Sequence, residues 1–152
     1  MPLAIGLSAQ QTARASAALA GAGAWDAAPT ELFISGAETV TIQFSYTRGG
    51  AGGAFDLQIQ TSIYSLAGNV PAGAAAWADG MAYGVGIIAA GVDTASAMQA
   101  EYVTCQATGA AQEIFQFTLQ GLGGTVERLR IPCRESGAIA TPGTLQITLV
   151  AQ

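Results

Sequence analysis

The charged and thiol side chains that could take part in acid–base, nucleophilic or metal chemistry are ten carboxylates, five arginines and two cysteines. The sequence contains no histidine and no lysine. Without histidine the chain cannot build a Ser-His-Asp or Cys-His nucleophile, and it lacks the commonest metal ligand. Ten acids could supply the carboxylate pair of a glycosidase, but most fall at the ends or on the polar faces of predicted strands. No nucleophile elbow, phosphate-binding glycine loop or calcium loop is present. We therefore expect no enzyme activity, no cofactor and no metal.

Two cysteines, Cys105 and Cys133, are the next candidates for chemistry. They do not form a C-x-x-C pair, so we expect neither a zinc site nor a redox motif. In the predicted strand registers Cys105 shares a face with Val103, and Cys133 shares one with Leu129 and Ile131, so both point inward. We favour two buried thiols that act as small apolar side chains, and a disulfide between them is the alternative.

Three of the five arginines, Arg128, Arg130 and Arg134, lie at alternate positions of one strand-like run, residues 125–134. They would form an outward stripe opposite Leu129 and Ile131, and guanidinium groups pair well with carboxylates at interfaces. One interpretation is docking to an acidic surface, including that of another copy. The other is pairing with neighbouring glutamates or protection of a sheet edge. Pro132 predicts an edge position or a bulge there, because it cannot donate to a central ladder.

Both tryptophans, Trp25 and Trp77, lie in predicted loops. Aromatic rings in loops serve as interface anchors or as platforms on which sugars stack. They also cap the ends of β-sandwich cores. We keep both tryptophans as candidate partner-interface residues.

Charge is scarce: 10% of the residues are charged, against about 25% in typical soluble proteins. Because a monomer usually stays soluble through a charged surface, this deficit of charge indicates that other subunits cover much of the protein's surface. The alternative is an acidic monomer with a Ser/Thr/Gln/Gly surface. The net charge of −5 argues against a nucleic-acid partner. No apolar run approaches the roughly 18 residues of a membrane span, so we expect no membrane association.

The elements that position these residues read as strands. Five runs alternate apolar and polar residues with period 2, namely residues 39–46, 55–63, 113–120, 125–134 and 144–150. With shorter runs between them, they predict about eight strands in one domain over residues 31–152. The fold class is an all-β antiparallel sandwich or jelly roll, with a small barrel as the alternative. Residues 39–46 and 55–63 predict a hairpin.

Residues 1–30 differ in composition, because they are rich in alanine and glycine. Ser8 and Gln11 have the spacing of a helix capping box, and Gly21 fits a C-cap, so residues 8–20 allow a short helix. Its alanine face would bury little area. We interpret the segment as an N-terminal arm that becomes ordered on a neighbouring subunit, and a disordered tail is the alternative.

The arm, residues 1–24, is followed by uninterrupted strands and a closing hairpin, residues 128–137 and 141–149. This arrangement resembles the small jelly-roll decoration (cement, or auxiliary) proteins of tailed bacteriophage capsids, particularly those of thermophilic phages. The resemblance implies a homotrimer that bridges subunits of the major capsid protein at three-fold positions. It also implies a place on the capsid exterior of the virion, after assembly in the host cytoplasm.

Two other functions fit the same pattern. One is a carbohydrate-binding β-sandwich module that uses Trp25 or Trp77. The other is a jelly-roll protein of a phage tail or baseplate, which shares the fold and differs in partner.

Overall fold

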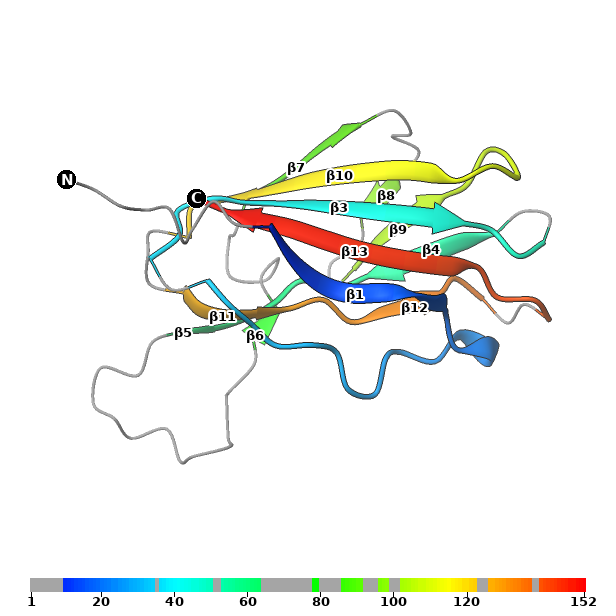
Figure 1. Ribbon diagram of the computed structural model, residues 1–152, viewed down its shortest axis with the longest axis horizontal. Helices are drawn as coiled ribbons and strands as arrows, with labels where there is room; N and C mark the ends of the chain where they lie inside the picture. The colour runs from blue at the N-terminus through cyan, green and yellow to red at the C-terminus, as the bar shows by residue number, and fades with distance from the viewer. Residues whose placement is uncertain are drawn as a thin grey trace.

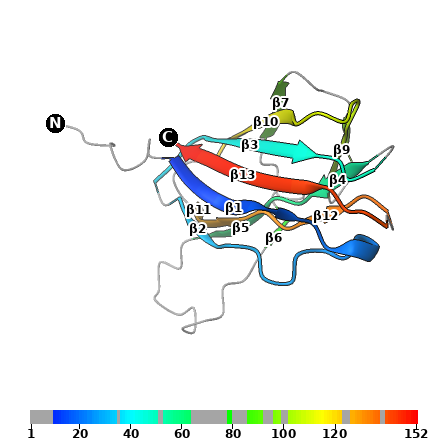
Figure 2. The same ribbon diagram turned by 45° about the vertical axis from the view of Figure 1, so that its right-hand side comes forward.

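The computed structural model describes residues 10–34, 36–50, 53–63, 78–79, 86–91, 96–98, 102–122, 126–137 and 140–152. Antiparallel sheets pack against each other (Figures 1 and 2), so the predicted all-β sandwich is confirmed. The described residues form thirteen strands, several only two or three residues long, where the sequence predicted about eight. None of the described segments is a helix long and apolar enough to cross a membrane.

The first layer is a five-stranded antiparallel sheet. Its strands follow the order β1 (Gln10–Ala18), β13 (Thr144–Ala151), β3 (Val40–Thr47), β10 (Glu113–Gln120) and β7 (Gly86–Gly91). On β3, β10 and β13 every second side chain is buried, as the period-2 alternation predicts. Leu145, Ile147 and Leu149, for example, are all at most 2% exposed. The polar residues between them therefore form the outer face of the sandwich.

The second layer consists of two four-stranded parts that share one ladder. One part has the order β2 (Leu32–Phe33), β11 (Val126–Arg130), β5 (Gln60–Ile63) and β6 (Ala78–Asp79), and the other has β12 (Cys133–Glu135), β4 (Ala54–Leu57), β9 (Val103–Gln106) and β8 (Ser96–Met98). Arg130 opposes Gln60 and Cys133 opposes Leu57 in the same register. Between them the amide of Gln58 donates to the carbonyl of Pro132 at 3.0 Å. The proline interrupts the strand, because it has no amide hydrogen to donate.

Strands pair in a nested way. β3 pairs with β13, the β4–β5 run with the β11–β12 run, β7 with β10, and β8 with β9. The hairpin predicted between residues 39–46 and 55–63 is therefore wrong, because β3 and β4 lie in different layers. Alternation determines which side chains face inward, but it does not determine which strand becomes the neighbour.

The core lies between the layers and is aromatic at its centre. Phe55 of β4 inserts among three rings of the opposite sheet, with ring centroids 5.6 Å from Phe44, 4.9 Å from Tyr46 and 5.5 Å from Phe115. Phe44 also meets Phe117 edge-on at 5.6 Å. These separations are typical of favourable aromatic pairs. The two layers are thus joined by rings contributed from both sides.

Residues 10–18 form a strand, and the short helix that the sequence allows there is not formed. β1 pairs with β13 along the rim of the five-stranded sheet (Figure 1), with shifts in register around Arg14. Beyond it, the Leu19 amide donates to the Gly143 carbonyl at 2.9 Å, and the Asp26 amide donates to the Cys133 carbonyl at 3.0 Å. An alanine-rich helix would bury little apolar area, whereas a strand gains ladder hydrogen bonds. Residues 10–30, assigned to the arm from sequence, are therefore attached to the sandwich, and residues 1–9 lie outside the described residues.

Candidate docking surface

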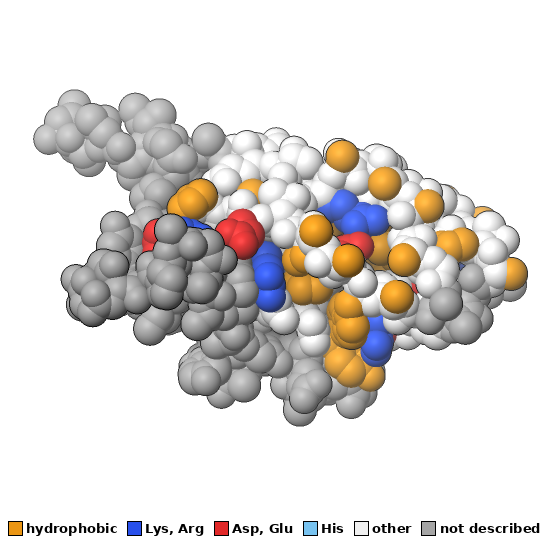
Figure 3. All heavy atoms as spheres, turned by 90° about the horizontal axis from the view of Figure 1, so that it is seen from below, with side chains coloured by type: hydrophobic (Ala, Val, Ile, Leu, Met, Phe, Trp, Pro, Cys, Tyr) orange, Lys and Arg blue, Asp and Glu red, His pale blue; other side chains and the backbone are white. Residues whose placement is uncertain are grey.

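The outer face of the second layer brings the three predicted arginines together. Arg128, Arg130 and Arg134 alternate with the inward-facing residues Leu129 and Ile131, which are at most 4% exposed. The sequence predicted that the three arginines share one face, and in the structure they do. Seen from below, the side on which residues 19–31 run, charged and hydrophobic side chains lie next to one another in small groups (Figure 3).

Arg128 lies against an exposed aromatic ring. Phe33, opposite it on the edge strand β2, is 61% exposed and is the large hydrophobic side chain that stands out on the described surface. The Arg128 guanidinium carbon is 5.0 Å from the centroid of that ring, within the range of a cation–π contact. Arg128 also faces two carboxylates, with Nη1 3.4 Å from Glu31 Oε2 and Nε 3.8 Å from Glu127 Oε1. We call these four residues the Phe33 anchor.

Arg134 is held more tightly, at the centre of a second group. Its guanidinium carbon lies 4.3 Å from the centroid of the Trp25 ring and 5.1 Å from that of Tyr102. Its Nε donates to Asp56 Oδ2 at 2.7 Å, and the Thr104 hydroxyl donates to Asp56 Oδ1 at the same distance. The Asp56 side chain is 3% exposed and that of Arg134 is 26% exposed, so the guanidinium is fixed from beneath. We call Trp25, Tyr102, Arg134 and Asp56 the Trp25 anchor.

Arg130 lies between the two anchors. Its Nε donates to Gln60 Oε1 at 2.6 Å. Burial lowers the pKa of this guanidinium, and the charge of Glu31 acts in the opposite direction. Each of the three arginines is therefore engaged with a neighbouring side chain. What the face offers a partner is aromatic surface braced by guanidinium groups. Of the two interpretations of the stripe, open guanidinium forks or pairing with neighbouring side chains, the contacts match the second, with Glu127 among the partners.

The two anchors are well separated. Residues 128 and 134 lie on one continuous ladder, and six residues at about 3.3 Å each place them roughly 20 Å apart. Trp25 has one ring face against Arg134, so that face is closed to a stacking sugar. Trp77, the other predicted aromatic candidate, lies outside the described residues.

Four members of the anchors were not predicted from the sequence: Glu31, Phe33, Asp56 and Tyr102. Asp56 is 78 positions from Arg134 in the chain, and only strand pairing brings them together. Phe33 lies on a two-residue strand, and no local pattern indicates that this strand pairs with β11. The alternation of residues 55–63 placed Asp56 on the polar face, and only the structure shows that its carboxylate is buried beneath Arg134.

Cys105 and Cys133 form no disulfide with each other in the structure, and both are fully buried. They belong to β9 and β12, the two strands that flank β4. Cys105 opposes Phe55 and Cys133 opposes Leu57, so two strand spacings and an offset of two residues put their Cα atoms about 12 Å apart. This is too far for a disulfide without movement of the backbone. Burial raises the pKa of the Cys133 thiol, and the charge of Asp26 adds to the effect. A buried, protonated thiol is a poor nucleophile.

We expect neither thiol to react with Ellman's reagent in the native protein at pH 8, and both to react once guanidinium unfolds the chain. The physical reason is that the thiolate is the reactive form and burial disfavours it. The measurement is the absorbance of the released thiolate with and without denaturant, in the absence of reductant. Fewer than two reactive thiols in the unfolded chain would reveal a disulfide, and rapid reaction of the native chain would contradict the burial.

Within the described ranges no three or more acidic or cysteine side chains lie close enough to hold a metal ion. Comparison of the chain with protein families, with curated proteins and with solved structures finds no match.

Proposed function

We propose that this protein is a viral structural protein, a jelly-roll capsid decoration protein that binds the outer surface of the major capsid protein lattice as a homotrimer. The observation that carries the proposal is the pair of aromatic–arginine anchors on one rigid face. Tryptophan, tyrosine and arginine are the residues most enriched at the energetic centres of protein interfaces. The nested pairing of strands supports the jelly-roll form.

The electrostatics of the face favour a protein as the partner. Arg128 is matched by Glu31 and Glu127, and Arg134 is matched by Asp56, so the anchors carry little net charge. A nucleic acid requires unmatched cations against its phosphates. A protein surface instead rewards rigid rings that lose little conformational freedom on binding.

Assembly on a capsid suits anchors of this kind because each contact is repeated. A homotrimer at a three-fold position presents three copies of both anchors to neighbouring capsid subunits. Simultaneous engagement multiplies modest affinities without new contacts. The 10% share of charged residues fits a protein that meets partners over part of its surface in the virion.

Phe33→Ala is expected to weaken binding to the capsid about 30-fold, the effect of removing an aromatic centre worth about 2 kcal/mol. The experiment is co-sedimentation of the purified protein with capsid shells assembled from the major capsid protein of the same virus. Because Phe33 is 61% exposed, the variant should fold normally. Gln120→Ala, an exposed change on the opposite layer, is the matched control and should bind as the unaltered protein does.

Light scattering of each variant, at the concentrations used for sedimentation, separates capsid binding from self-association. The unaltered chain is expected at about three times 15.2 kDa. Failure of the unaltered protein to sediment with shells would refute the decoration role, and sedimentation with phage tails would favour a tail or baseplate protein. Equal binding by Phe33→Ala would remove the Phe33 anchor from the interface.

A further inference from the structure

The outer face of the five-stranded sheet is uncharged over three adjacent strands. β3, β10 and β13 contribute twelve outward side chains, none of them ionisable. Ten of the twelve carry an amide or a hydroxyl group: Thr41, Gln43, Ser45, Thr47, Gln116, Thr118, Gln120, Thr144, Gln146 and Thr148. This face lies on the opposite side of the sandwich from the two anchors.

Strand register arranges these groups in rows across the sheet. Gln116 opposes Gln43, which opposes Thr148, and the row ends on Thr12 of β1. Directly opposed residues have Cβ atoms about 4.5–5.5 Å apart. The amides of Gln43 and Gln116 are therefore neighbours that can contact adjacent groups of one ligand.

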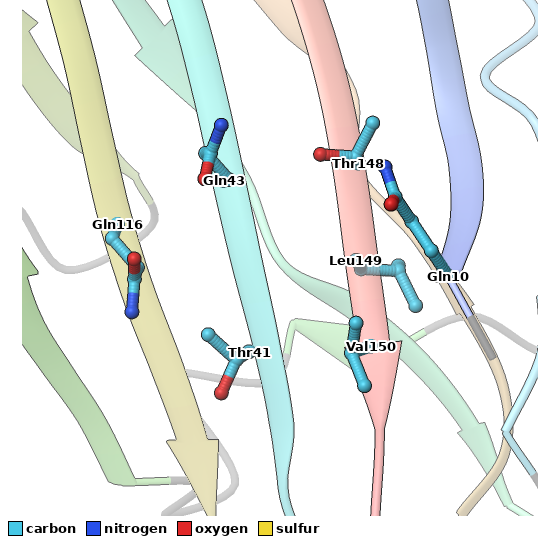
Figure 4. A pocket seen from close by; sticks show the side chains of 7 residues that line it. All are labelled: Gln10, Thr41, Gln43, Gln116, Thr148, Leu149 and Val150. Carbon is cyan, nitrogen blue, oxygen red and sulfur yellow. The ribbon is translucent and has the colours of Figure 1, made fainter. Parts of the chain in front are cut away.

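The face is hollowed where these rows meet β1. The hollow has a volume of about 250 Å³ and is lined by Gln10, Thr41, Gln43, Gln116, Thr148, Leu149 and Val150. Figure 4 shows these side chains coming from four strands, β10, β3, β13 and β1, around one site. Thr41 contacts Thr118 at 3.3 Å between their hydroxyl oxygens. Among the described residues, no group is hydrogen-bonded to the side-chain amides of Gln10, Gln43 or Gln116.

We propose that this hollow binds a neutral glycan. Each sugar hydroxyl both donates and accepts a hydrogen bond, and the glutamine amides and threonine hydroxyls of the lining do the same. Val150 adds a small apolar surface against which the C–H face of a sugar ring can pack. The lining has no cation for a phosphate or an acidic sugar, and no carboxylate for a basic ligand.

A protein partner fits this face less well. Interface centres are rich in tryptophan, tyrosine and arginine, and none of the twelve outward residues is of these types. The glycan site goes beyond the proposed decoration role and uses different residues. On a capsid held through the anchors, the opposite layer would point away from the shell and could meet glycans of a host surface.

The test is native electrophoresis in gels that contain soluble polysaccharides: dextran, mixed-linkage β-glucan, mannan or galactomannan, with polygalacturonate as an anionic comparison. The unaltered protein is expected to be retarded by at least one neutral polysaccharide and not by polygalacturonate. The double variant Gln43→Ala/Gln116→Ala should lose affinity about tenfold or more, because two hydrogen-bonding amides are removed. Gln120→Ala, on the same strand as Gln116 but outside the hollow, should bind normally.

Gln43 and Gln116 are both exposed, so the double variant should melt at the same temperature as the unaltered protein. Measuring both melting temperatures checks that the fold is intact. Absence of retardation in every neutral gel overturns the proposal, as does equal retardation of the double variant. Retardation in polygalacturonate alone also overturns it, because the lining is uncharged. A change in solution mass of the double variant without any retardation would place a protein partner on this face instead. These outcomes are independent of the capsid experiment, which depends on the other layer.

Discussion

Phe55→Ala is expected to lower the free energy of unfolding by about 3–5 kcal/mol, the usual loss for a buried phenylalanine. Its ring is fully buried and contacts the rings of Phe44, Tyr46 and Phe115, which all belong to the opposite layer. Those rings are fixed in β3 and β10 and can collapse only partly into the space left behind. Urea denaturation followed by tryptophan fluorescence measures the change.

Phe33→Ala is the matched control, because it removes the same side chain from a position that is 61% exposed. We expect this change to stay within about 0.5 kcal/mol. A loss of less than about 1 kcal/mol in Phe55→Ala would mean that the layers are not held together by the aromatic cluster. Similar losses in both variants would contradict the difference in burial.

The inward-facing side chains were predictable from sequence, whereas the pairing of strands was not. Period 2 alone placed Leu145, Ile147 and Leu149 on the buried face. Nothing local indicates that β3 pairs with β10 and β13, because those contacts join residues about 70 and 100 positions apart, as in Phe44 with Phe115 and Ile147. The false hairpin and the missed strand β1 have this common cause.

The docking face was predictable only in part, for the same reason. The alternation of residues placed Arg128, Arg130 and Arg134 on one face. The alternation is maintained across Pro132, because the pairing of Gln58 with Pro132 keeps the strands in the same register. The partners of these arginines depend on which strands lie alongside. Phe33 reaches Arg128 only because β2 pairs with β11. The sequence therefore indicated a row of arginines, whereas the structure shows two of them packed against aromatic rings in the two anchors.

The low charge of the chain is divided unequally between the two layers. The outward positions of β3, β10 and β13 carry no charge, while the second layer holds all three arginines of the stripe together with Asp56 and Glu127. A protein whose two faces contacted only water would not need to keep its charged residues on one layer and its uncharged polar residues on the other. Two faces of different chemistry are what the two proposals require, a protein partner on the anchors and a neutral glycan on the amide face.

Tyr46→Phe is expected to cost about 2–3 kcal/mol, because it leaves a buried carboxyl oxygen without its donor. The Tyr46 hydroxyl donates to Glu135 Oε1 at 2.8 Å, and the Gly143 amide donates to Glu135 Oε2 at 3.1 Å. Both side chains are fully buried, and the bond ties β3 of one layer to β12 of the other. Urea denaturation at pH 7 measures the loss. Tyr102→Phe, whose hydroxyl makes no hydrogen bond to the described residues, is the control and should change stability by less than about 0.5 kcal/mol.

Comparison of the unaltered protein with Tyr46→Phe also tests how the free energy of unfolding depends on alkaline pH. Burial raises the pKa of Tyr46, and the hydrogen bond to Glu135 and the charge of Glu135 raise it further. Above about pH 10 the unfolded chain loses the tyrosine proton while the folded chain keeps it, so stability falls by about 1.4 kcal/mol per pH unit. Tyr46→Phe lacks this contribution. The difference in unfolding free energy between the two proteins should therefore shrink between pH 9 and about 11.5. A constant difference over that range would mean that Tyr46 ionises as readily in the folded protein as in the unfolded chain, and that the contact with Glu135 does not hold the proton.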